Sequence, residues 1–149
     1  MLLKEVCTPD VVCCGVKTTA TEAAQLMRHR HVGDLVVVDD PHGDCIPLGV
    51  VTDRDLVIEI MGNGLDPARA TMASLMRTPV VIAHESEDTA RVIERMRAHG
   101  VRRVPVVNHE GSAVGIITLD DLLRLFVAEA SALLDIVTKG QNHEHRSLR

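Results

Sequence analysis

The sequence predicts an α/β (α+β) protein made of two pseudo-symmetric β-α-β-β-α motifs that pack together through their small sheets. Two observations lead to this prediction: an internal repeat, and a hydrophobic period that changes from that of a strand to that of a helix and back within each copy. The 149 residues are 46% hydrophobic and 25% charged, which is ordinary for a globular protein. Two small repeats of this size are expected to share one core.

The repeat is visible by direct alignment. Residues 31–39 lie over residues 100–108, and residues 49–56 lie over residues 115–122. The offset shrinks by three residues between these blocks, because the loop at residues 40–47 is longer in the first copy. Matching segments with a short loop insertion are typical of a duplication.

Each copy shows the same order of elements. A short β-branched run precedes an amphipathic helix, two further apolar runs follow as strands, and a second helix closes the unit. These elements are expected at residues 11–13, 21–29, 35–38, 48–51 and from Thr52 to about Gly62, and again at residues 80–82, 89–99, 104–107, 114–117 and from Thr118. Thr19 and Glu22 are typical of a capping box. The first crossover is expected to be parallel, and the third strand antiparallel to the second.

We assign residues 1–64 to the first motif, residues 65–128 to the second, and residues 129–149 to a helical extension and a polar tail. Apolar residues at helical spacing carry the last helix to about Lys139; they are Leu122, Leu123, Phe126, Ala130, Leu133, Leu134 and Val137. We expect this face to pack on its own module or on a dimer mate, with docking onto another protein as the alternative. The tail from residue 141 is expected to fray, and His143 and His145 are weak indications of a metal.

Composition excludes some partners. A net charge of -5 attracts no polyanion, and a chain with one Phe and no Trp or Tyr offers no stacking platform for bases, so we expect no nucleic acid. The N-terminus lacks the order of a signal peptide, and no apolar run approaches the roughly 20 residues that span a bilayer. We therefore expect a cytoplasmic protein with no membrane partner.

Several motifs resemble the CBS domain pair, or Bateman module. The segments GVVTDRDL and GIITLDDL follow the third strands, and VRRVPVV lies on a second strand. The resemblance covers about residues 3–127, and VVTDRDLVIEIMGNGLDP is similar to small stand-alone bacterial two-CBS proteins. This resemblance implies a non-enzymatic regulatory module that binds an adenosine-containing ligand in the cleft between the motifs. It also implies that the module needs no obligatory cofactor and forms a homodimer. An unidentified protein target is a further option.

The Thr-x-x-Asp element occurs in both copies, as Thr52 with Asp55 and as Thr118 with Asp121. A strand that turns directly into a helix presents free backbone N–H groups, which suit a phosphate. A carboxylate accepts two hydrogen bonds from a vicinal diol such as that of ribose. The alternative is that each Thr and Asp only cap their own helix.

Basic residues complete the expected phosphate site. The resemblance assigns this role to Arg102 and Arg103, whose forked donors match phosphate geometry, and Arg54 adds charge beside the first Thr-x-x-Asp. A solvated surface pair is the alternative. The first copy has Gly33 and Asp34 where the second has the arginine pair, so the two sites are expected to be unequal.

The adenine is expected between the first and second strands of one copy, again by resemblance. The residues at these positions are aliphatic: Val11, Val12, Cys13, Leu35 and Val36 in site one, and Val80, Val81, Ile82, Val104 and Pro105 in site two. Such walls fit a flat purine, and backbone groups would have to read its edge.

Three other functions have weaker support in the sequence. No P-loop, nucleophile elbow or HExxH pattern indicates an enzyme. A metal or redox sensor would rest on Cys7, Cys13, Cys14 and Cys45 together with the eight histidines. The cysteines lack CxxC spacing, and the adjacent pair leaves a strand on opposite faces, so we interpret them as reduced, mostly buried thiols. A structural dimerisation module with vestigial sites is the third. The residues do not choose among AMP, ADP, ATP, NAD and S-adenosylmethionine, nor do they fix site occupancy, dimer geometry or target.

Overall fold

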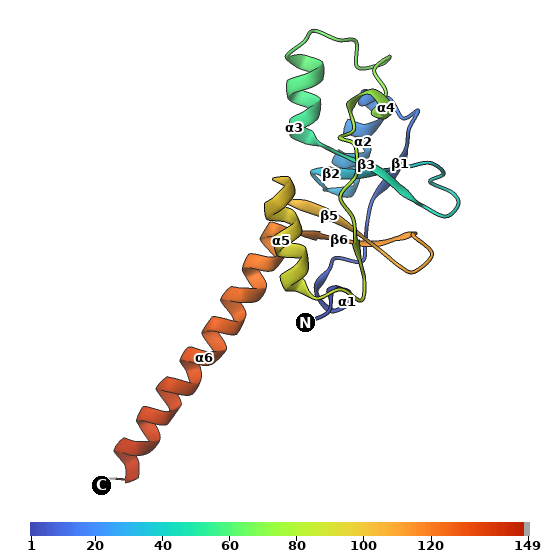
Figure 1. Ribbon diagram of the computed structural model, residues 1–149. Coiled ribbons are helices and arrows are strands. Elements are labelled where there is room, and N and C mark those ends of the chain that lie inside the picture. Colours follow the sequence, from blue (N-terminus) through green and yellow to red (C-terminus); the bar gives the residue numbers. More distant parts are fainter. Residues whose placement is uncertain (148–149) are drawn as a thin grey trace.

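The computed structural model describes residues 1–147 and contains two stacked motifs, each built on a three-stranded sheet (Figure 1). In the first motif β1 (Cys13–Gly15) runs parallel to β2 (Asp34–Val38), and β3 (Pro47–Thr52) is antiparallel to β2. Valines dominate β2, and four consecutive residues of it are buried because both faces of the small sheet are covered.

Helices connect and close the first motif. α2 (Ala20–Arg30) is the crossover between β1 and β2. The predicted capping box is confirmed, since the Glu22 amide donates to Thr19 Oγ1 at 3.2 Å and the Thr19 amide donates to Glu22 Oε2 at 2.9 Å. The closing helix begins as α3 (Asp53–Asp55) and continues as the π-helical segment η1 (Leu56–Met61).

The second motif repeats this order. β4 (Ala83–His84) is parallel to β5 (Arg103–Val107), and β6 (Ala113–Thr118) is antiparallel to β5. α5 (Thr89–His99) is the crossover helix, and α6 (Leu119–Ser147) closes the motif. The predicted β-α-β-β-α order and strand directions are confirmed in both copies.

The short helix that precedes each motif packs on the other motif. α1 (Leu3–Val6) contributes Leu3 to the core of the second motif, whereas α4 (Met72–Leu75) contributes Met72 to the core of the first. Backbone bridges follow each of them. Thr8 exchanges two hydrogen bonds of 2.9 Å with Ile116 of β6, and the Arg77 amide lies 3.5 Å from the Val50 carbonyl of β3. The two motifs are therefore linked by reciprocal exchange of these segments.

A third apolar cluster joins the motifs. Its buried members are Val36 and Val38 of β2 and Ile116 of β6, with Val11 and Cys13 packed beside them. The predicted packing of the motifs through their sheets is thus observed directly in side chains from both.

The first strand of each motif begins later than predicted. Residues 11–12 and 80–82 were expected as strand, but β1 begins at Cys13 and β4 at Ala83. The earlier residues are still crossing from the sheet of the other motif, so they lie at the junction between motifs and cannot pair fully with the second strand.

α6 differs most from expectation. It continues to Ser147 and projects away from the body (Figure 1), so the predicted end near Lys139 and the predicted fraying from residue 141 are wrong. The segment contains no proline, and Gly140 alone does not end a long helix. Of its expected apolar face only Leu122 is buried in the module, while Leu123 and the later residues are exposed. No described helix is both long enough and apolar enough to cross a membrane.

Candidate functional site

Two pockets lie where the motifs meet. The first, which we name the arginine pocket, has a volume of about 220 Å³. Its walls are Val50, Thr52, Arg54, Asp55, Arg77, Pro79, Val80, Val81, Gly100, Val101, Arg102 and Arg103. The second, the aspartate pocket, has a volume of about 180 Å³. Its walls are Thr8, Asp10, Val11, Val12, Val32, Gly33, Asp34, Val36, Ile116, Thr118 and Asp121.

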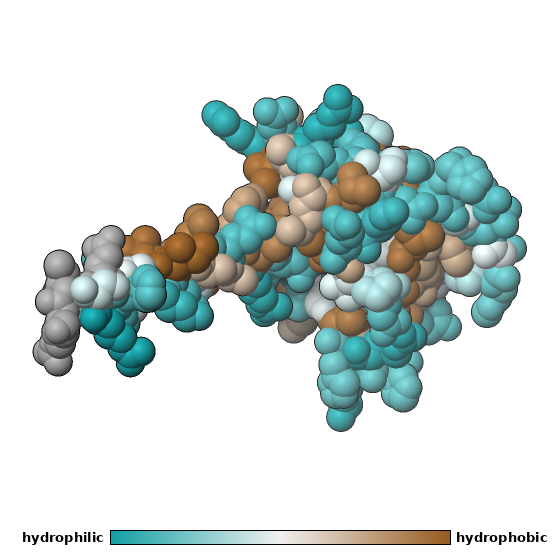
Figure 2. All heavy atoms as spheres, turned by 90° about the horizontal axis from the view of Figure 1, so that it is seen from below, coloured by the Kyte–Doolittle hydropathy of each residue, from teal (hydrophilic) through white to brown (hydrophobic). Residues whose placement is uncertain are grey.

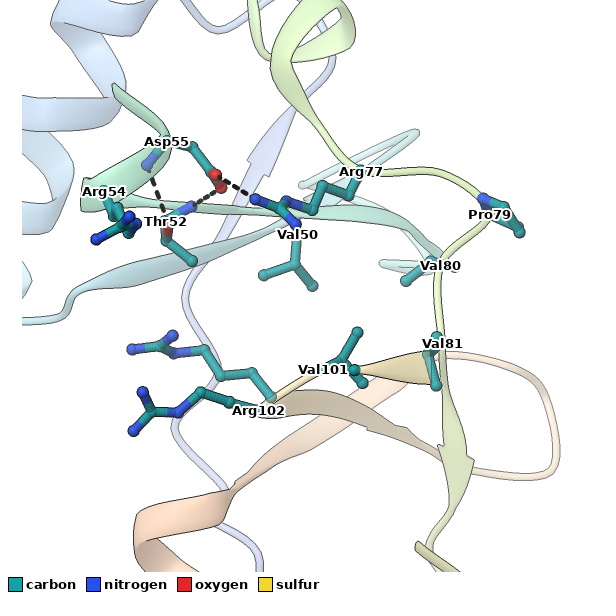
Figure 3. Close-up of a pocket in the computed structure, with 12 residues that line it drawn as sticks. Val50, Thr52, Arg54, Asp55, Arg77, Pro79, Val80, Val81, Val101 and Arg102 are labelled. Atoms are coloured by element: carbon teal, nitrogen blue, oxygen red, sulfur yellow. Dashed lines mark hydrogen bonds and ion pairs between the residues drawn. The ribbon is translucent and has the colours of Figure 1, made fainter. Parts of the chain in front are cut away.

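Each pocket takes its parts from both motifs. In the arginine pocket Thr52, Arg54 and Asp55 of the first motif face Val101 and Arg102 of the second, and Val80 and Val81 close one side (Figure 3). In the aspartate pocket Thr118 and Asp121 of the second motif meet Val11, Val12 and Val36 of the first. The exchanged segments produce this arrangement, because they carry the residues before β1 and β4 onto the opposite sheet.

The Thr-x-x-Asp elements do cap their helices. The Asp55 amide donates to Thr52 Oγ1 at 3.2 Å, and Asp55 Oδ2 accepts from the Thr52 amide at 2.9 Å. The second copy repeats this with Thr118 and Asp121, and the Thr118 hydroxyl donates to Asp121 Oδ2 at 2.7 Å. Each Thr and Asp therefore cap their own helix, as the capping alternative predicts. In both caps the bonded carboxylate oxygen is Oδ2, so the other oxygen, Oδ1, is not used by the cap.

Asp55 Oδ1 reaches into the arginine pocket. It accepts from Arg77 Nη2 at 3.3 Å (Figure 3). The Arg77 side chain is 82% exposed, whereas the Asp55 side chain is only 10% exposed. A ligand donor can replace so exposed a partner at little cost, because water already screens the pair. Sequence reasoning missed Arg77; the Thr-Pro dipeptides at residues 8–9 and 78–79 were the signal that the segment before each first strand belongs to the repeat.

One ion pair joins the two pockets. Arg103 Nε, in the wall of the arginine pocket, lies 3.0 Å from Asp34 Oδ2, in the wall of the aspartate pocket. That oxygen is buried, and its contact with Arg103 is not aligned as a hydrogen bond. Burial raises the pKa of Asp34 above its usual value, and the Arg103 guanidinium opposes that rise.

Five residues expected around the adenine do not line either pocket. Leu35 and Val104 belong to the helix-facing cores, because alternate residues of a strand point to opposite faces. Pro105 is fully buried. Ile82 is 39% exposed, and Cys13 packs in the cluster between the motifs. Val11, Val12, Val36, Val80 and Val81 do lie on the pocket walls.

The four cysteines are free thiols. Cys14 is buried and the other three are half-buried. Burial raises the pKa of Cys13 and of Cys14 to about 11. Within residues 1–147 as described, no three His, Cys, Asp or Glu side chains gather in a way that would hold a metal ion.

The chain resembles known proteins over most of its length. The CBS domain model matches residues 3–62 and 72–128. Hypoxic response protein 1 of Mycobacterium tuberculosis is 36% identical over 121 residues, which are 81% of this chain and 82% of that protein. The uncharacterized protein MK0525 of Methanopyrus kandleri is 32% identical over 121 residues; the match covers 81% of this chain and only 60% of that protein.

Two solved structures share the fold. Hypoxic response protein I, crystallised with two coordinated zinc ions, has a TM-score of 0.73 and 34% identity over 83% of this chain and 98% of its own. The CBS domain pair of protein MJ0100, in complex with 5'-methylthioadenosine and S-adenosyl-L-methionine, has a TM-score of 0.74 and 27% identity over 87% of this chain and 98% of its own. The repeat, the topology and these matches together identify the chain as a member of the CBS domain family that carries its two motifs as a tandem pair.

Proposed function

We propose that this CBS pair is a non-enzymatic regulatory module that binds an adenosine-containing ligand in the arginine pocket, with the aspartate pocket as a second and different site. The observation that carries the proposal is the Asp55 carboxylate. One of its oxygens holds the helix start, and the other points into a pocket that both motifs build.

The walls suit the parts of such a ligand. Asp55 Oδ1 can accept from ribose hydroxyls once Arg77 swings away, and the backbone at Thr52 stays fixed by its cap. Val50, Val80 and Val81 give an apolar surface against which a purine can lie. The adenosyl ligands bound by the CBS pair of MJ0100 support this assignment by analogy.

Ligand binding would act through the contact between the motifs. Because both motifs contribute to each pocket, an occupant contacts both and favours the relative packing that fits it best. The shift is limited by the difference in the ligand's affinity for the two arrangements. Four free cysteines are usual in a reducing compartment. We therefore continue to predict a cytoplasmic location.

Thermal unfolding with a ligand panel tests the proposal. The panel contains AMP, ADP, ATP, NAD, S-adenosylmethionine, GTP and zinc, against the unmodified protein, Asp55→Asn, Asp121→Asn and the exposed control Asp39→Asn. We expect an upward shift of Tm with at least one adenosyl compound, since a ligand at 100 times its Kd stabilises the fold by about 2.7 kcal/mol. The shift should disappear in Asp55→Asn for a ligand of the arginine pocket, or in Asp121→Asn for a ligand of the aspartate pocket, and should persist in Asp39→Asn. No shift with any adenosyl compound, or a shift with zinc alone, contradicts the proposal.

We also propose that the module forms a homodimer through α6. The α6 apolar face consists of Leu123, Phe126, Val127, Ala130, Leu133, Leu134 and Val137. Figure 2 shows apolar surface along one side of the projecting helix, and the large members are between 47% and 66% exposed. A contiguous row of exposed large apolar residues along one helix face is typical of an interaction surface.

The pattern of this face fits a second copy of itself. It is symmetric about Ala130, with apolar residues at three, four and seven positions on either side. An antiparallel pair of α6 helices centred there would set Leu123 against Val137 and Phe126 against Leu134. A two-fold interface needs such self-complementarity, and the small Ala130 side chain lets the helices approach at the crossing.

A further inference from the structure

The two pockets carry opposite charge. Four guanidinium groups, of Arg54, Arg77, Arg102 and Arg103, line the arginine pocket against the single carboxylate of Asp55. The residues that line the aspartate pocket include three carboxylates, of Asp10, Asp34 and Asp121, and no lysine or arginine. The duplicated fold therefore presents the same Thr-x-x-Asp element in two electrostatically different settings.

Within the arginine pocket, Arg103 is paired with Asp34 at 3.0 Å, whereas the pairs of Arg102 and Arg77 are weaker. Arg102 is 71% exposed and its nearest carboxylate, of Asp120, is 4.0 Å away and 67% exposed, so water screens that pair. Among the described residues, Asp55 is the one carboxylate paired with the Arg77 guanidinium, and a ribose would engage it. Guanidinium groups match the geometry of phosphate oxygens and donate to them in pairs. A phosphate extending from the ribose would meet these groups.

In the aspartate pocket a phosphate would lie among carboxylates, of which, in the part of the chain that the structure describes, only the exposed Asp10 has a cation on the same side, Arg30 at 2.9 Å. Asp34 is a half-buried residue of the pocket wall; burial raises its pKa, and the carboxylates of Asp53 and Asp121 add to that rise. Its balancing cation, Arg103, faces the other pocket. Bringing a further anion to this site is unfavourable because like charges in a partly dry cavity repel strongly.

We propose that the two pockets divide adenosyl ligands by charge, the arginine pocket taking an adenosine nucleotide with its 5'-phosphates and the aspartate pocket taking an adenosyl compound without phosphate. This inference rests on the proposed function and adds to it the ligand class of each site. The chain would then compare a phosphorylated with an unphosphorylated adenosyl compound.

The Arg103–Asp34 ion pair couples the two sites. A phosphate that attracts Arg103 draws it away from Asp34 and leaves that carboxylate less balanced. A positively charged adenosyl ligand, such as the sulfonium S-adenosylmethionine, is then held more tightly in the aspartate pocket. Linkage requires that the effect be mutual, so each ligand raises the affinity of the other by the same factor.

Isothermal titration with ATP, adenosine and S-adenosylmethionine tests this division, using the unmodified protein, Asp55→Asn and Asp121→Asn. We expect ATP to bind one site per chain and to lose that binding in Asp55→Asn. Adenosine or S-adenosylmethionine binding should survive in Asp55→Asn at one site and be lost there when Asp121→Asn is added. Raising the salt concentration should lower the affinity for ATP and leave the affinity for adenosine nearly unchanged, because screening acts on the phosphate charges.

Two arginine substitutions, one inside the arginine pocket and one outside both pockets, separate the effect of phosphate contact from a general loss of charge. Arg102→Gln removes one pocket guanidinium and should weaken ATP about ten-fold or more while changing adenosine affinity less than two-fold, as expected for loss of a charge-assisted contact. Arg97→Gln, an exposed arginine of α5 outside both pockets, should change neither. ATP bound equally at both sites, or preferring the site that Asp121→Asn abolishes, overturns the division while leaving adenosyl binding intact. Failure of every adenosyl compound to bind instead overturns the proposed function and this inference with it.

Discussion

Asp55 shows how one side chain serves two levels of the structure. Its Oδ2 accepts the Thr52 amide and closes the capping box, and its Oδ1 faces the arginine pocket. A carboxylate with two oxygens can hold a helix start and a ligand at once, so capping and binding are not exclusive. Asparagine keeps one acceptor for the cap, which is why Asp55→Asn separates the two roles better than alanine does.

The cysteine thiols are predicted to be unreactive. Burial raises the pKa of Cys13 and of Cys14 from 9.0 to about 11, so almost no thiolate exists at pH 8. We expect slow alkylation of these two thiols at pH 8 in the folded protein and fast alkylation after unfolding. Because the folded pKa is raised, the contribution of these thiols to stability is complete below pH 9 and is lost as the pH rises through about 11. Mass spectrometry measures the extent of alkylation at each thiol over time. Rapid labelling of both thiols in the folded protein at pH 8 would contradict this account.

At the residue scale the sequence predicts polar site residues better than apolar ones. Thr52 and Asp55 are fixed by local geometry at a helix start, and local geometry is what a motif encodes. Leu35 and Val104 were expected at the ligand but belong to the cores, because neighbouring valines and leucines of a buried strand look alike in the sequence while facing opposite ways. Arg77 was missed since its contact with Asp55 spans 22 positions along the chain.

At the element scale, the third strands make room for the exchanged segments. A Cβ at Gly115 would lie 2.8 Å from the Thr8 carbonyl oxygen and 2.8 Å from Cys7 Sγ. At Gly49 a Cβ would lie 2.7 Å from Met76 Cβ. Both glycines therefore allow close approach of the segment that crosses from the other motif.

Gly115→Ala is expected to destabilise the protein by about 1–3 kcal/mol, since the added methyl group meets backbone that cannot move without breaking the Thr8 bridge. Gly140→Ala is the matched control: nothing lies within 4 Å of a Cβ there, and alanine in a helix should stabilise by up to about 1 kcal/mol. Urea unfolding measures both. Equal stability of Gly115→Ala and the unmodified protein would contradict the close contact.

The α6 helix carries the prediction for assembly. Phe126→Glu together with Leu134→Glu should convert the dimer into a monomer, because charges then replace paired apolar residues on the α6 apolar face. Ala128→Glu, on the opposite face of the same helix, should leave the dimer intact. Sedimentation velocity measures the mass of each variant. A dimer that survives the double substitution would show that another surface joins the copies.

The hydrophobic periodicity predicts which helices and strands form more reliably than it predicts where they end. Strand order, strand direction and the capping box at Thr19 are as predicted, because each depends on neighbouring residues. The end of α6 was placed too early, since a polar, exposed segment gives no periodic signal even when it stays helical.

At the scale of the whole molecule, reciprocal exchange gives the protein its sites. The residues before each first strand cross to the other motif, so neither motif contains a complete pocket. A repeat in the sequence cannot predict this exchange, because the alignment is the same whether a segment packs on its own copy or on the other. The division of the chain at residues 64 and 65 stays a prediction for the same reason.

The most direct test of the central claim is a crystal structure of the protein soaked or grown with the adenosyl compound that raises its Tm most. The account predicts the ribose hydroxyls on a Thr-x-x-Asp carboxylate, Asp55 for a phosphorylated ligand, with the purine against valines contributed by the exchanged segment. A ligand bound elsewhere, or one held within a single motif, would contradict it.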